Sequence, residues 1–536
     1  MNAQVTFTDT IIHEAGTGGQ HGRGLALGDF NGDGEVDLVV SNPGLNLTTR
    51  AWALAGPDFE VHSELAIPNM SEYEIFPGVG DPFILSDLNG DGLDDLLMGS
   101  HWSTAGAQNF LVGRVLIGIA PEFNEWIALQ HPAPGQTIEF GTSAVVHDFT
   151  GDGIPDVAVG SPRAMGQAGA IGVGRVDIFD GTMLDEPSAL TLQPPLREQF
   201  ADNWGRVLLV EDWLGDEDFE LLINDRTDPP AIDDFSFLDD KSPSPFGSWD
   251  LGQSGNFWNN EIAADLDGDG LSDVLLASQD SVALAYGPTF EQQQFFNEPP
   301  GDPSTEWGDA LAVGDVNRDG HLDILIGAHL LDHPVLDSEV GLVRIFFGPD
   351  FESFQGLWGS QEFAQFGIGV ETIDLNSDGF VELIIAAGSE SGGRIHLFQH
   401  ETLRVLAGQQ LSLSSGGVTE YSLEVGPLGG NQQYLVTLSA SGSEPGVELA
   451  ASQGSIKLPI NPDGLTYFAL AQANEPMFEA FLGTTDAEGM ASPRLVLSPL
   501  SDPSLIGVVV TAAGVLFNDA GALDYVTDAA EIELVQ

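Results

Sequence analysis

The chain contains no cysteine among its 536 residues. A disulfide framework, a thiolate zinc site and a cysteine nucleophile are therefore excluded. Long apolar runs are also missing: the longest, Leu505 to Phe517, is too short to cross a bilayer and predicts a strand. The first residues lack the basic and apolar regions of a signal peptide, so we expect a signal removed before this numbering or another export route.

Basic residues are scarce: 15 Lys plus Arg stand against 82 Asp plus Glu, for a net charge of −67. A surface this acidic repels nucleic acid and anionic lipid, so neither is expected as a partner. Six bound Ca²⁺ would still leave about −55, so the metal loops described below do not explain the acidity. It favours a salt-adapted surface, with an acidic face for a cationic partner as the alternative. A hydrophobic content of 42% and 31 Phe exclude a disordered chain.

Catalytic signatures are missing as well. The sequence holds no G-x-S-x-G, no H-E-x-x-H and no P-loop. A polysaccharide lyase needs a Tyr or His base beside clustered cations, and the 6 Tyr and 15 basic residues form no such cluster in the sequence. We therefore predict that the protein is not an enzyme.

One acidic phrase is abundant instead. Its best copies read Asp-x-Asn/Asp-x-Asp-Gly-x-x-Asp, and seven copies begin at Asp29, Asp87, Asp148, Asp212, Asp265, Asp315 and Asp374, 50 to 64 residues apart. A period of this length is typical of an array of supersecondary units. A glycine stands seven residues before the first Asp in six copies, so the repeat is a structural unit and not a set of independent loops.

The segments around each phrase predict strands. In the third copy an apolar segment leads into Asp148, and the β-rich run Val157-Ala158-Val159 leaves the loop. A third strand follows a later glycine, as in Gly174-Arg-Val-Asp-Ile-Phe, with room for a fourth in the variable segment. Four-stranded sheets repeated radially form a propeller. We predict an all-β fold, a seven-bladed β-propeller over residues 1–404, and Val5 to Ile12 as the strand that closes its ring.

The phrase itself is a set of oxygen ligands suited to Ca²⁺. Positions 1, 3, 5 and 9 carry side-chain oxygens, the glycine at position 6 permits a sharp turn, and the position-7 carbonyl can face inward. Six loops are predicted to hold structural Ca²⁺. Their ligands, from position 1 to position 9, are Asp29, Asn31, Asp33, Glu35 and Asp37; Asp87, Asn89, Asp91, Leu93 and Asp95; Asp148, Thr150, Asp152, Ile154 and Asp156; Asp265, Asp267, Asp269, Leu271 and Asp273; Asp315, Asn317, Asp319, His321 and Asp323; and Asp374, Asn376, Asp378, Phe380 and Glu382.

Two alternatives to this assignment fit the residues less well. An EF-hand requires a carboxylate at position 12, where these loops carry apolar residues such as Val40 and Ile326. A solvated hairpin turn explains one such cluster but not six in register. The fourth copy is degraded, because Leu214 replaces the third-position ligand and Glu217 the glycine, so the loop beginning at Asp212 is predicted to be empty.

Phe140-Gly141, the acidic loop and Gly160-Ser161-Pro162 follow one another in the third copy. In this order they resemble the FG-GAP repeat of integrin α-subunit propellers, and the resemblance covers roughly residues 5 to 400. It implies seven blades, with Ca²⁺ loops between the first and second strands of each blade on one face. It also implies that ligands meet the opposite face.

After about Leu406 the acidic phrase stops and short alternating strands appear, such as Glu420-Tyr-Ser-Leu-Glu-Val and Gln433-Tyr-Leu-Val-Thr-Leu. Turns such as Asn461-Pro-Asp-Gly464 separate them. We predict a β-sandwich over residues 405–536 with an accessory or assembly role.

The loops joining second to third strands are expected opposite the calcium face. They contain His101, Trp102, Arg163 and His329, which we predict to contact a protein or glycan ligand. The alternative is that Trp102 packs against a neighbouring loop and the histidines are ordinary polar surface.

These features together predict an extracellular or cell-surface calcium-binding propeller that acts in adhesion or ligand binding. A structural subunit of a surface layer or appendage, formed by self-assembly, is the first alternative. A carbohydrate-active enzyme is the second.

Overall fold

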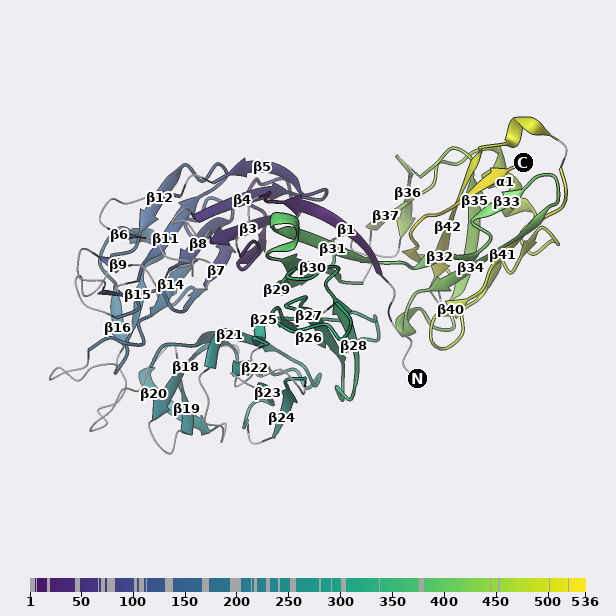
Figure 1. Cartoon of the computed structure of the whole chain (residues 1–536). Helices are drawn as coiled ribbons and strands as arrows, with labels where there is room; N and C mark the ends of the chain where they lie inside the picture. The colour runs from purple at the N-terminus through teal and green to yellow at the C-terminus, as the bar shows by residue number, and fades with distance from the viewer. Residues whose placement is uncertain are drawn as a thin grey trace.

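The computed structural model describes residues 5, 7–16, 20–43, 49–65, 67–68, 73–74, 82–100, 104–105, 110–111, 113–130, 138–165, 173–192, 204–213, 215, 219–227, 232–239, 242–250, 257–278, 281–290, 292–299, 305–336, 338–375, 380–443, 445–451, 454–500, 502–518 and 520–536. Within these ranges, residues 7 to 400 form seven four-stranded antiparallel sheets arranged around a common centre (Figure 1). The expected all-β fold of repeated four-stranded sheets is confirmed.

Each sheet takes its strands in chain order from the centre outward, except that the last sheet is completed by the N-terminal strand. The sheets are β2 (Leu25–Gly28), β3 (Asp37–Pro43), β4 (Thr49–Ala55) and β5 (Glu60–Glu64); β7 (Phe83–Ser86), β8 (Asp95–Gly99), β11 (Val115–Ile119) and β12 (Glu125–Ala128); β13 (Ala144–His147), β14 (Asp156–Gly160), β15 (Val176–Phe179) and β16 (Leu190–Leu192); β17 (Leu208–Glu211), β18 (Glu220–Thr227), β19 (Ile232–Asp239) and β20 (Ser242–Asp250); β21 (Phe257–Ala264), β22 (Asp273–Ser278), β23 (Ser281–Ala285) and β24 (Gln293–Asn297); β25 (Trp307–Gly314), β26 (Asp323–Ala328), β27 (Leu342–Phe347) and β28 (Ser353–Trp358); and β29 (Phe366–Ile373), β30 (Glu382–Ala387), β31 (Arg394–His400) and β1 (Phe7–Glu14).

The connections add short elements to this plan. A small sheet joins β6 (Tyr73–Glu74), β9 (Thr104–Ala105) and β10 (Phe110–Leu111). Single 3₁₀ turns are η3 (Gly181–Met183), η4 (Glu390–Gly392), η5 (Pro427–Gly429) and η6 (Pro503–Leu505).

The second strand of a sheet is the most enclosed. Every residue of β8, β14, β26 and β30 is buried, because neighbouring sheets cover both faces of these strands. This explains their nearly continuous apolar sequences, which a half-exposed strand would interrupt with polar residues.

The glycine seven residues before each acidic loop marks a close contact between neighbouring sheets. A side chain on Gly22 would place its Cβ 2.4 Å from the Cβ of Ala386, and one on Gly141 would lie 2.6 Å from the carbonyl oxygen of Arg114. Both glycines also have positive φ, which other residues rarely adopt. The shared glycine offset therefore reflects the packing of each sheet against the preceding one.

The N-terminal strand completes the last sheet. β1 pairs antiparallel with β31, from Phe7 opposite His400 to Glu14 opposite Arg394, which confirms the predicted closing strand and extends it to Glu14. In Figure 1, β1 lies along β31. Two strands separated by almost 400 residues of sequence therefore share one sheet.

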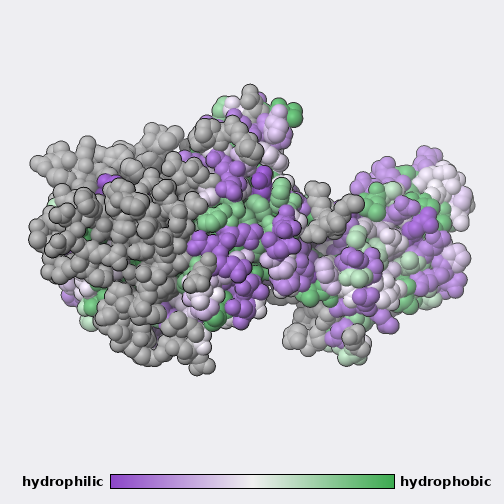
Figure 2. All heavy atoms as spheres, turned by 90° about the horizontal axis from the view of Figure 1, so that it is seen from below, coloured by the Kyte–Doolittle hydropathy of each residue, from purple (hydrophilic) through white to green (hydrophobic). Residues whose placement is uncertain are grey.

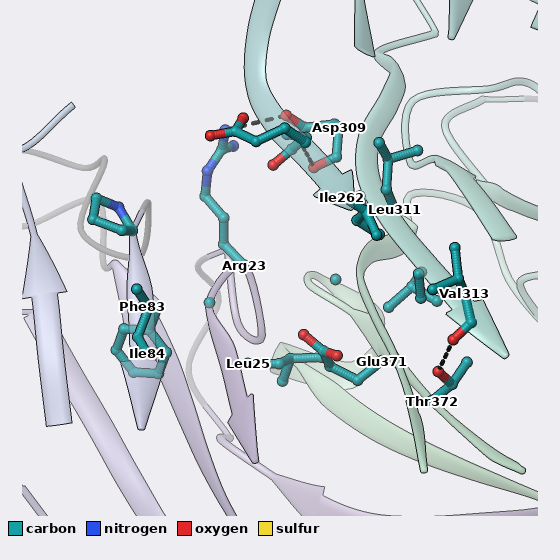
Figure 3. A pocket seen from close by; sticks show the side chains of 18 of the residues that line it. Arg23, Leu25, Phe83, Ile84, Ile262, Asp309, Leu311, Val313, Glu371 and Thr372 are labelled. Atoms are coloured by element: carbon teal, nitrogen blue, oxygen red, sulfur yellow. Dashed lines mark hydrogen bonds and ion pairs between the residues drawn. The ribbon is translucent and has the colours of Figure 1, made fainter. Parts of the chain in front are cut away.

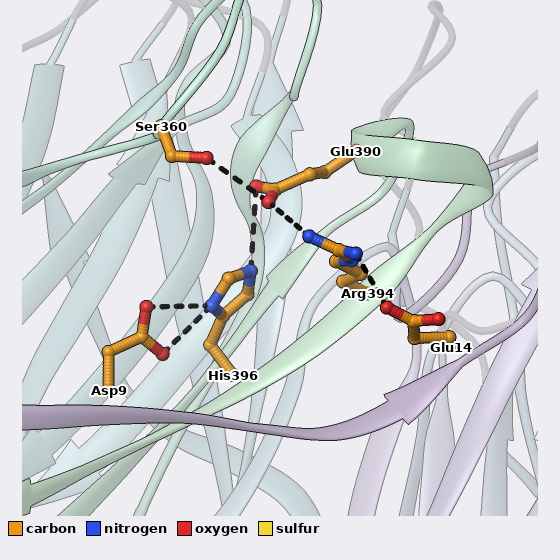
Figure 4. A network of polar contacts seen from close by, with 6 residues as sticks. All are labelled: Asp9, Glu14, Ser360, Glu390, Arg394 and His396. Atoms are coloured by element: carbon orange, nitrogen blue, oxygen red, sulfur yellow. Dashed lines mark hydrogen bonds and ion pairs between the residues drawn. The ribbon is translucent and has the colours of Figure 1, made fainter.

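Ion pairs reinforce this closure (Figure 4). His396 on β31 contacts the Asp9 carboxylate at 2.9 Å and Glu390 at 3.5 Å, and Arg394 contacts Glu14 at 2.6 Å. Burial lowers the pKa of His396, but the hydrogen bonds and charges of Asp9 and Glu390 outweigh it and raise the pKa to about 9. His396 is therefore cationic at neutral pH and holds two acidic groups from separate elements.

The C-terminal residues form two further sheets. One contains β32 (Leu403–Ala407), β34 (Gly417–Glu424), β41 (Arg494–Leu497), β38 (Phe478–Glu479) and β40 (Met490–Ala491). The other contains β33 (Gln410–Ser412), β44 (Ala530–Val535), β42 (Val509–Phe517), β35 (Gln433–Ser439), β39 (Leu482–Thr484) and β43 (Leu523–Val526). Side chains from both sheets share one core, as in a sandwich.

Two details of this C-terminal unit differ from the sequence expectation. A hairpin of β36 (Val447–Ala451) and β37 (Gly454–Leu458) is followed by a helix, α1 (Gly464–Ala471), where a simple turn was expected. Asp463 accepts hydrogen bonds from the Leu465 and Thr466 amides and so caps the helix. β32 begins at Leu403, just before the predicted boundary at 404. Figure 2 shows polar and apolar residues interspersed over the described surface of this unit.

The sandwich docks on the sixth and seventh acidic loops of the propeller. Arg318, in the sixth loop, donates a hydrogen bond to the Val425 carbonyl at 3.2 Å, and its guanidinium lies 4.6 Å from the ring centroid of Tyr525. Phe380, at position 7 of the seventh loop, packs 6.1 Å from the same ring and belongs to the core of the C-terminal unit. Two acidic loops are therefore also contact surfaces between the two units.

Arg318 occupies a position that is glycine in five of the other loops: Gly32, Gly90, Gly151, Gly215 and Gly268. It keeps the left-handed conformation of those glycines, with φ +55°. A non-glycine residue in this region carries a backbone cost, which the contacts with Val425 and Tyr525 offset. The substitution is thus explained by the neighbouring unit and not by the loop.

We expect Arg318→Gly to loosen the docking of the two units without disturbing the sixth loop, because glycine is the residue that the other loops use at this position. Faster hydrogen exchange at residues 425–430 and faster proteolysis near residue 401 would measure the change. Arg50→Gly, at the exposed Arg50–Glu64 pair, is the control and should leave both rates unchanged. Unchanged rates in Arg318→Gly would show that the cation–aromatic contact does not hold the units together.

The closing strand should respond to pH through His396. Its pKa of about 9 lies above the ordinary value of 6.5, so its contribution to stability is complete below about pH 6.5 and is lost as pH rises through about 9. His396→Asn should lower the free energy of unfolding by about 2 kcal/mol at pH 6 and by much less at pH 9.5. Denaturant unfolding at the two pH values measures this difference, with the exposed His62→Asn as control; a penalty independent of pH would contradict it.

Candidate metal centres and channel face

The acidic loops connect the first strand of a sheet to the second. In the loop between β21 and β22, the carboxylates of Asp265, Asp267 and Asp269 offer oxygens that all lie within 4.8 Å of one another. The Asp265 carboxylate also accepts hydrogen bonds from the Gly268, Asp269 and Gly270 amides at 2.8 to 3.0 Å. Backbone donors and the two left-handed glycines thus bend the loop so that three carboxylates converge.

The same backbone pattern recurs in other loops. The position-1 carboxylates of Asp29, Asp87 and Asp148 accept bonds from the amides of residues three and five positions later. The position-5 carboxylate accepts the position-7 amide, as in Asp91 and Leu93 at 3.0 Å. The loop conformation is therefore encoded by the repeated phrase. The inward turn of the position-7 carbonyl stays a prediction.

The position-9 acid differs from the other predicted side-chain ligands because it is buried. Each carries at most 2% exposure: Asp37, Asp95, Asp156, Glu220, Asp273, Asp323 and Glu382. Asp273 accepts one hydrogen bond from the Leu266 amide inside the loop at 2.9 Å and one from the Gly287 amide outside it at 2.8 Å. This acid joins the loop to the turn between the third and fourth strands.

Burial raises the pKa of these acids: to about 6 for Asp95 and Asp273, and to about 7 for Asp323. A neighbouring divalent cation would favour the ionised form and oppose the rise. The carboxylates of one loop repel one another, whereas carboxylate and amide oxygens are the ligands that Ca²⁺ prefers. The donor set therefore fits a hard divalent cation.

The outer partner of the position-9 acid belongs to a second repeat that the sequence analysis missed. Gly or Ala, Pro, any residue and Phe follow the third strand in four sheets: Gly56 to Phe59, Ala120 to Phe123, Gly287 to Phe290 and Gly348 to Phe351. The amide of the first residue donates to the position-9 acid, and the Phe is buried. The recurrence of this short motif, 14 to 25 residues after the position-9 acid, is the signal that reveals it.

Several loops depart from the best copies. Thr150 hydrogen-bonds Asp156 through both its amide and its hydroxyl. In the fourth loop, Asp212 accepts the Gly215 amide at 2.7 Å and Glu220 accepts the Trp213 amide at 3.0 Å, but Leu214 and Glu217 lie outside the described residues. Asn376 and Asp378 of the seventh loop also lie outside them. The emptiness of the fourth loop stays a prediction.

The inner strands enclose a cavity of about 500 Å³ (Figure 3). The first residues of β2, β7, β13 and β17 line it, whereas the acidic loops follow the last residues of these strands. β25 and β29 line it as far as Val313 and Thr372, one residue before each strand ends, so the cavity occupies the propeller centre along the inner strands. Its walls are mostly aliphatic, with the charged groups Arg23, Glu261, Asp309 and Glu371.

A cluster of polar side chains lies at one side of this cavity. Arg23 contacts the Asp309 carboxylate at 3.2 Å, and the Nδ1 atom of His329 lies 3.2 Å from the second oxygen of Asp309. Asn260 donates to the carbonyls of Gly308 and Asp309. Burial lowers the pKa of His329, although Asp309 opposes this.

The predicted ligand-contacting residues have separate surroundings. His329 follows β26 on the expected face but is only 4% exposed, so the structure places it behind Asp309 and not on the surface. Arg163, half-exposed, contacts Glu139 at 2.9 Å. His101 and Trp102 lie outside the described residues. Arg23, Asn260 and Asp309 were missed, because nothing local in the sequence separates them from ordinary strand residues.

No helix in the described ranges combines the length and the apolar character needed to cross a membrane.

Comparisons with known proteins agree with the repeat. The FG-GAP repeat family matches residues 21–54 and 140–179, and the FG-GAP-like repeat family matches residues 265–326. The chain therefore carries FG-GAP repeats, as the resemblance implied.

Three curated relatives show the extent of the similarity. Integrin alpha-PS2 of Drosophila melanogaster is 33% identical over 175 residues, which cover 30% of this chain and 12% of that protein. Cartilage acidic protein 1 of Mus musculus is 30% identical over 209 residues, 38% of this chain and 27% of that protein. Phosphatidylinositol-glycan-specific phospholipase D of Bos taurus is 28% identical over 178 residues, 26% of this chain and 21% of that protein. The chain thus spans less than a third of the length of each relative.

The fifth loop allows the two kinds of acid to be separated by mutation. Asp269→Asn keeps an oxygen for the Leu271 amide and removes one charge, so it should weaken the response to Ca²⁺ while leaving stability in chelator unchanged or slightly higher. Asp273→Asn should cost about 1–3 kcal/mol even in chelator, because one buried amide loses its acceptor.

Denaturant unfolding of both variants with Ca²⁺ and with EGTA measures this contrast. Equal destabilisation of both variants in EGTA would contradict a structural role specific to the position-9 acid.

Proposed function

Because the chain carries FG-GAP repeats on an all-β fold, we propose that it is an extracellular or cell-surface binding module. Its propeller holds structural Ca²⁺ in the acidic loops and recognises a protein or glycan ligand with the opposite face. The observation that supports this best is the convergence of the Asp265, Asp267 and Asp269 carboxylates in a loop whose phrase recurs in register around the ring. Repulsion among these groups is relieved by a divalent cation.

Bound Ca²⁺ would supply positive charge to each loop, and the chain's own residues determine what that does. The position-9 acid joins the loop to the outer turn, as Asp323 does by accepting hydrogen bonds from the Val316 and Gly348 amides. Each filled loop thereby fixes three of the four strands of its sheet. The face opposite the loops is then held as a rigid surface on which residues such as Arg163 are presented.

The module is proposed to act by binding and not by catalysis. Two of the charged groups around the cavity, Arg23 and Asp309, engage one another, and the loop aspartates serve the metal. Export to a compartment with abundant Ca²⁺ agrees with exposed loops of this ligand type.

A second candidate is a subunit of an extracellular assembly, favoured by one observation. The helix α1 exposes Tyr467, Phe468 and Leu470 at 67%, 49% and 41%. Large apolar side chains gathered on one short helix are more typical of a contact surface than of a solvated one. In this alternative the C-terminal unit joins neighbouring copies of the chain.

Removal of metal tests the calcium proposal. EGTA should lower the melting temperature by more than about 5 °C, since each filled site stabilises the folded state by mass action, and renewed Ca²⁺ should restore it. Titration calorimetry should count about six sites, and Asp212→Asn should leave that number unchanged. An unchanged melt in EGTA would overturn the calcium proposal.

The binding proposal is tested on protein and glycan arrays with the calcium-loaded chain. Binding that is lost in EGTA and reduced by Arg163→Glu would support recognition by the face opposite the loops. Sedimentation of the same samples distinguishes the second candidate: ordered Ca²⁺-dependent assembly, abolished by Tyr467→Ser and without array binding, would favour it instead.

A further inference from the structure

The central cavity contains a carboxyl group that has no cationic partner among the described residues. Glu371, on β29, points into the cavity in Figure 3, and no hydrogen bond or ion pair engages its side chain within the part of the chain that is described. Its surroundings are aliphatic, with Leu25 and Val370 close to it in the wall. Burial raises the pKa of Glu371 to about 8, with no neighbouring charge contributing.

The other charged groups of the wall do not serve Glu371. Arg23, the one basic residue among the described residues that line the cavity, is paired with Asp309. Glu261 and Asp309 add two further acids. The wall therefore carries a net negative charge when its acids are ionised, and the chain as a whole carries −67. This field attracts cations and repels anions.

The remaining wall decides which cation fits. Ca²⁺ and Mg²⁺ need six or more oxygen ligands, and Glu371 offers two among aliphatic side chains such as Ile84, Ile262 and Leu311. The Thr372 hydroxyl is already donated to the Val313 carbonyl at 2.6 Å. An apolar wall with one unpaired carboxyl suits a molecule that has a hydrocarbon body and one ammonium group. A volume of about 500 Å³ lies within the range of small-molecule sites.

We propose that the central cavity of the propeller is a binding site for a small amphipathic amine, whose ammonium pairs with Glu371 and whose hydrocarbon body lies along the inner strands. The site is separate from the acidic loops and independent of the proposed function. A cation there compensates Glu371, whose carboxyl has no partner among the described residues.

Binding is tested by titration calorimetry of the calcium-loaded full chain in 150 mM salt at pH 7. The probes are n-hexylammonium, ethylammonium and hexanoate. Hexylammonium should bind with one site per chain and at least tenfold more tightly than either of the others, because ethylammonium lacks the apolar body and hexanoate has the wrong charge. Equal binding of the two amines would indicate acidic surface groups and overturn the proposal.

Variants locate the site. Glu371→Gln keeps the size of the side chain and should weaken hexylammonium binding at least tenfold, whereas the exposed Glu352→Gln should not change it. Circular dichroism and the melting temperature verify that both variants are folded. Undiminished binding in Glu371→Gln would overturn the proposal.

Proton release provides a readout that needs no variant. Glu371 is mostly protonated at pH 7, so pairing with an ammonium group should release close to one proton per bound amine, which titration in two buffers of different ionisation enthalpy measures. Of the other charged groups that face the cavity, Arg23 stays protonated and is paired with Asp309. Glu261, unlike Glu371, has an interaction partner of its own. Binding without proton release would place the amine elsewhere and contradict the assignment.

Discussion

The propeller depends on a buried carboxylate that joins the acidic loop to an outer turn, as seen at Asp37, Asp95, Asp156, Asp273 and Asp323. Asp273 accepts one amide from its own loop and another from the turn beyond the third strand, and Asp323 does the same in the next sheet. A buried charge requires such donors, because an uncompensated one is costly. The acidic loop is therefore a structural joint of the sheet as well as a ligand set. The seven sheets can share one design because every repeat carries this acid.

Much of the propeller fold, including its acidic loops, was predictable from residues at fixed spacing. The aspartates and glycines of the phrase predicted both the loop turns and the strands beside them, since short-range hydrogen bonds such as Asp265 to the Gly268 amide encode the conformation locally. The closing strand was also predictable, because an unassigned β-rich segment preceded the first repeat. Side-chain pairs across the ring were not predictable from the sequence. His329 was expected at the surface and is buried against Asp309, and the Arg23–Asp309 pair spans 286 residues of sequence.

In the C-terminal unit, too, local features were predictable from the sequence and long-range contacts were not. Its alternating strands were readable, and the apolar run ending at Phe517 became β42 as expected. The helix α1 was not predictable, because Asn461-Pro-Asp-Gly464 has the composition of a turn. The capping by Asp463 depends on Thr466, which lies beyond that turn. Arg318 stands where most of the other loops have glycine. Its partners, Val425 and Tyr525, lie more than 100 residues downstream, so no local pattern could assign the contact.

The pairing of β1 with β31 also has a consequence for biosynthesis. A ribosome makes Phe7 long before it makes His400, its opposite residue, so the first strand must wait for most of the propeller to emerge. Until then the seventh sheet lacks its outer strand, and an unpaired edge is open to wrong partners. Such late joining of distant segments slows folding, since a long stretch of chain has to be ordered first. The acidity of the nascent chain would help here, because like-charged copies repel one another while the edge is still exposed.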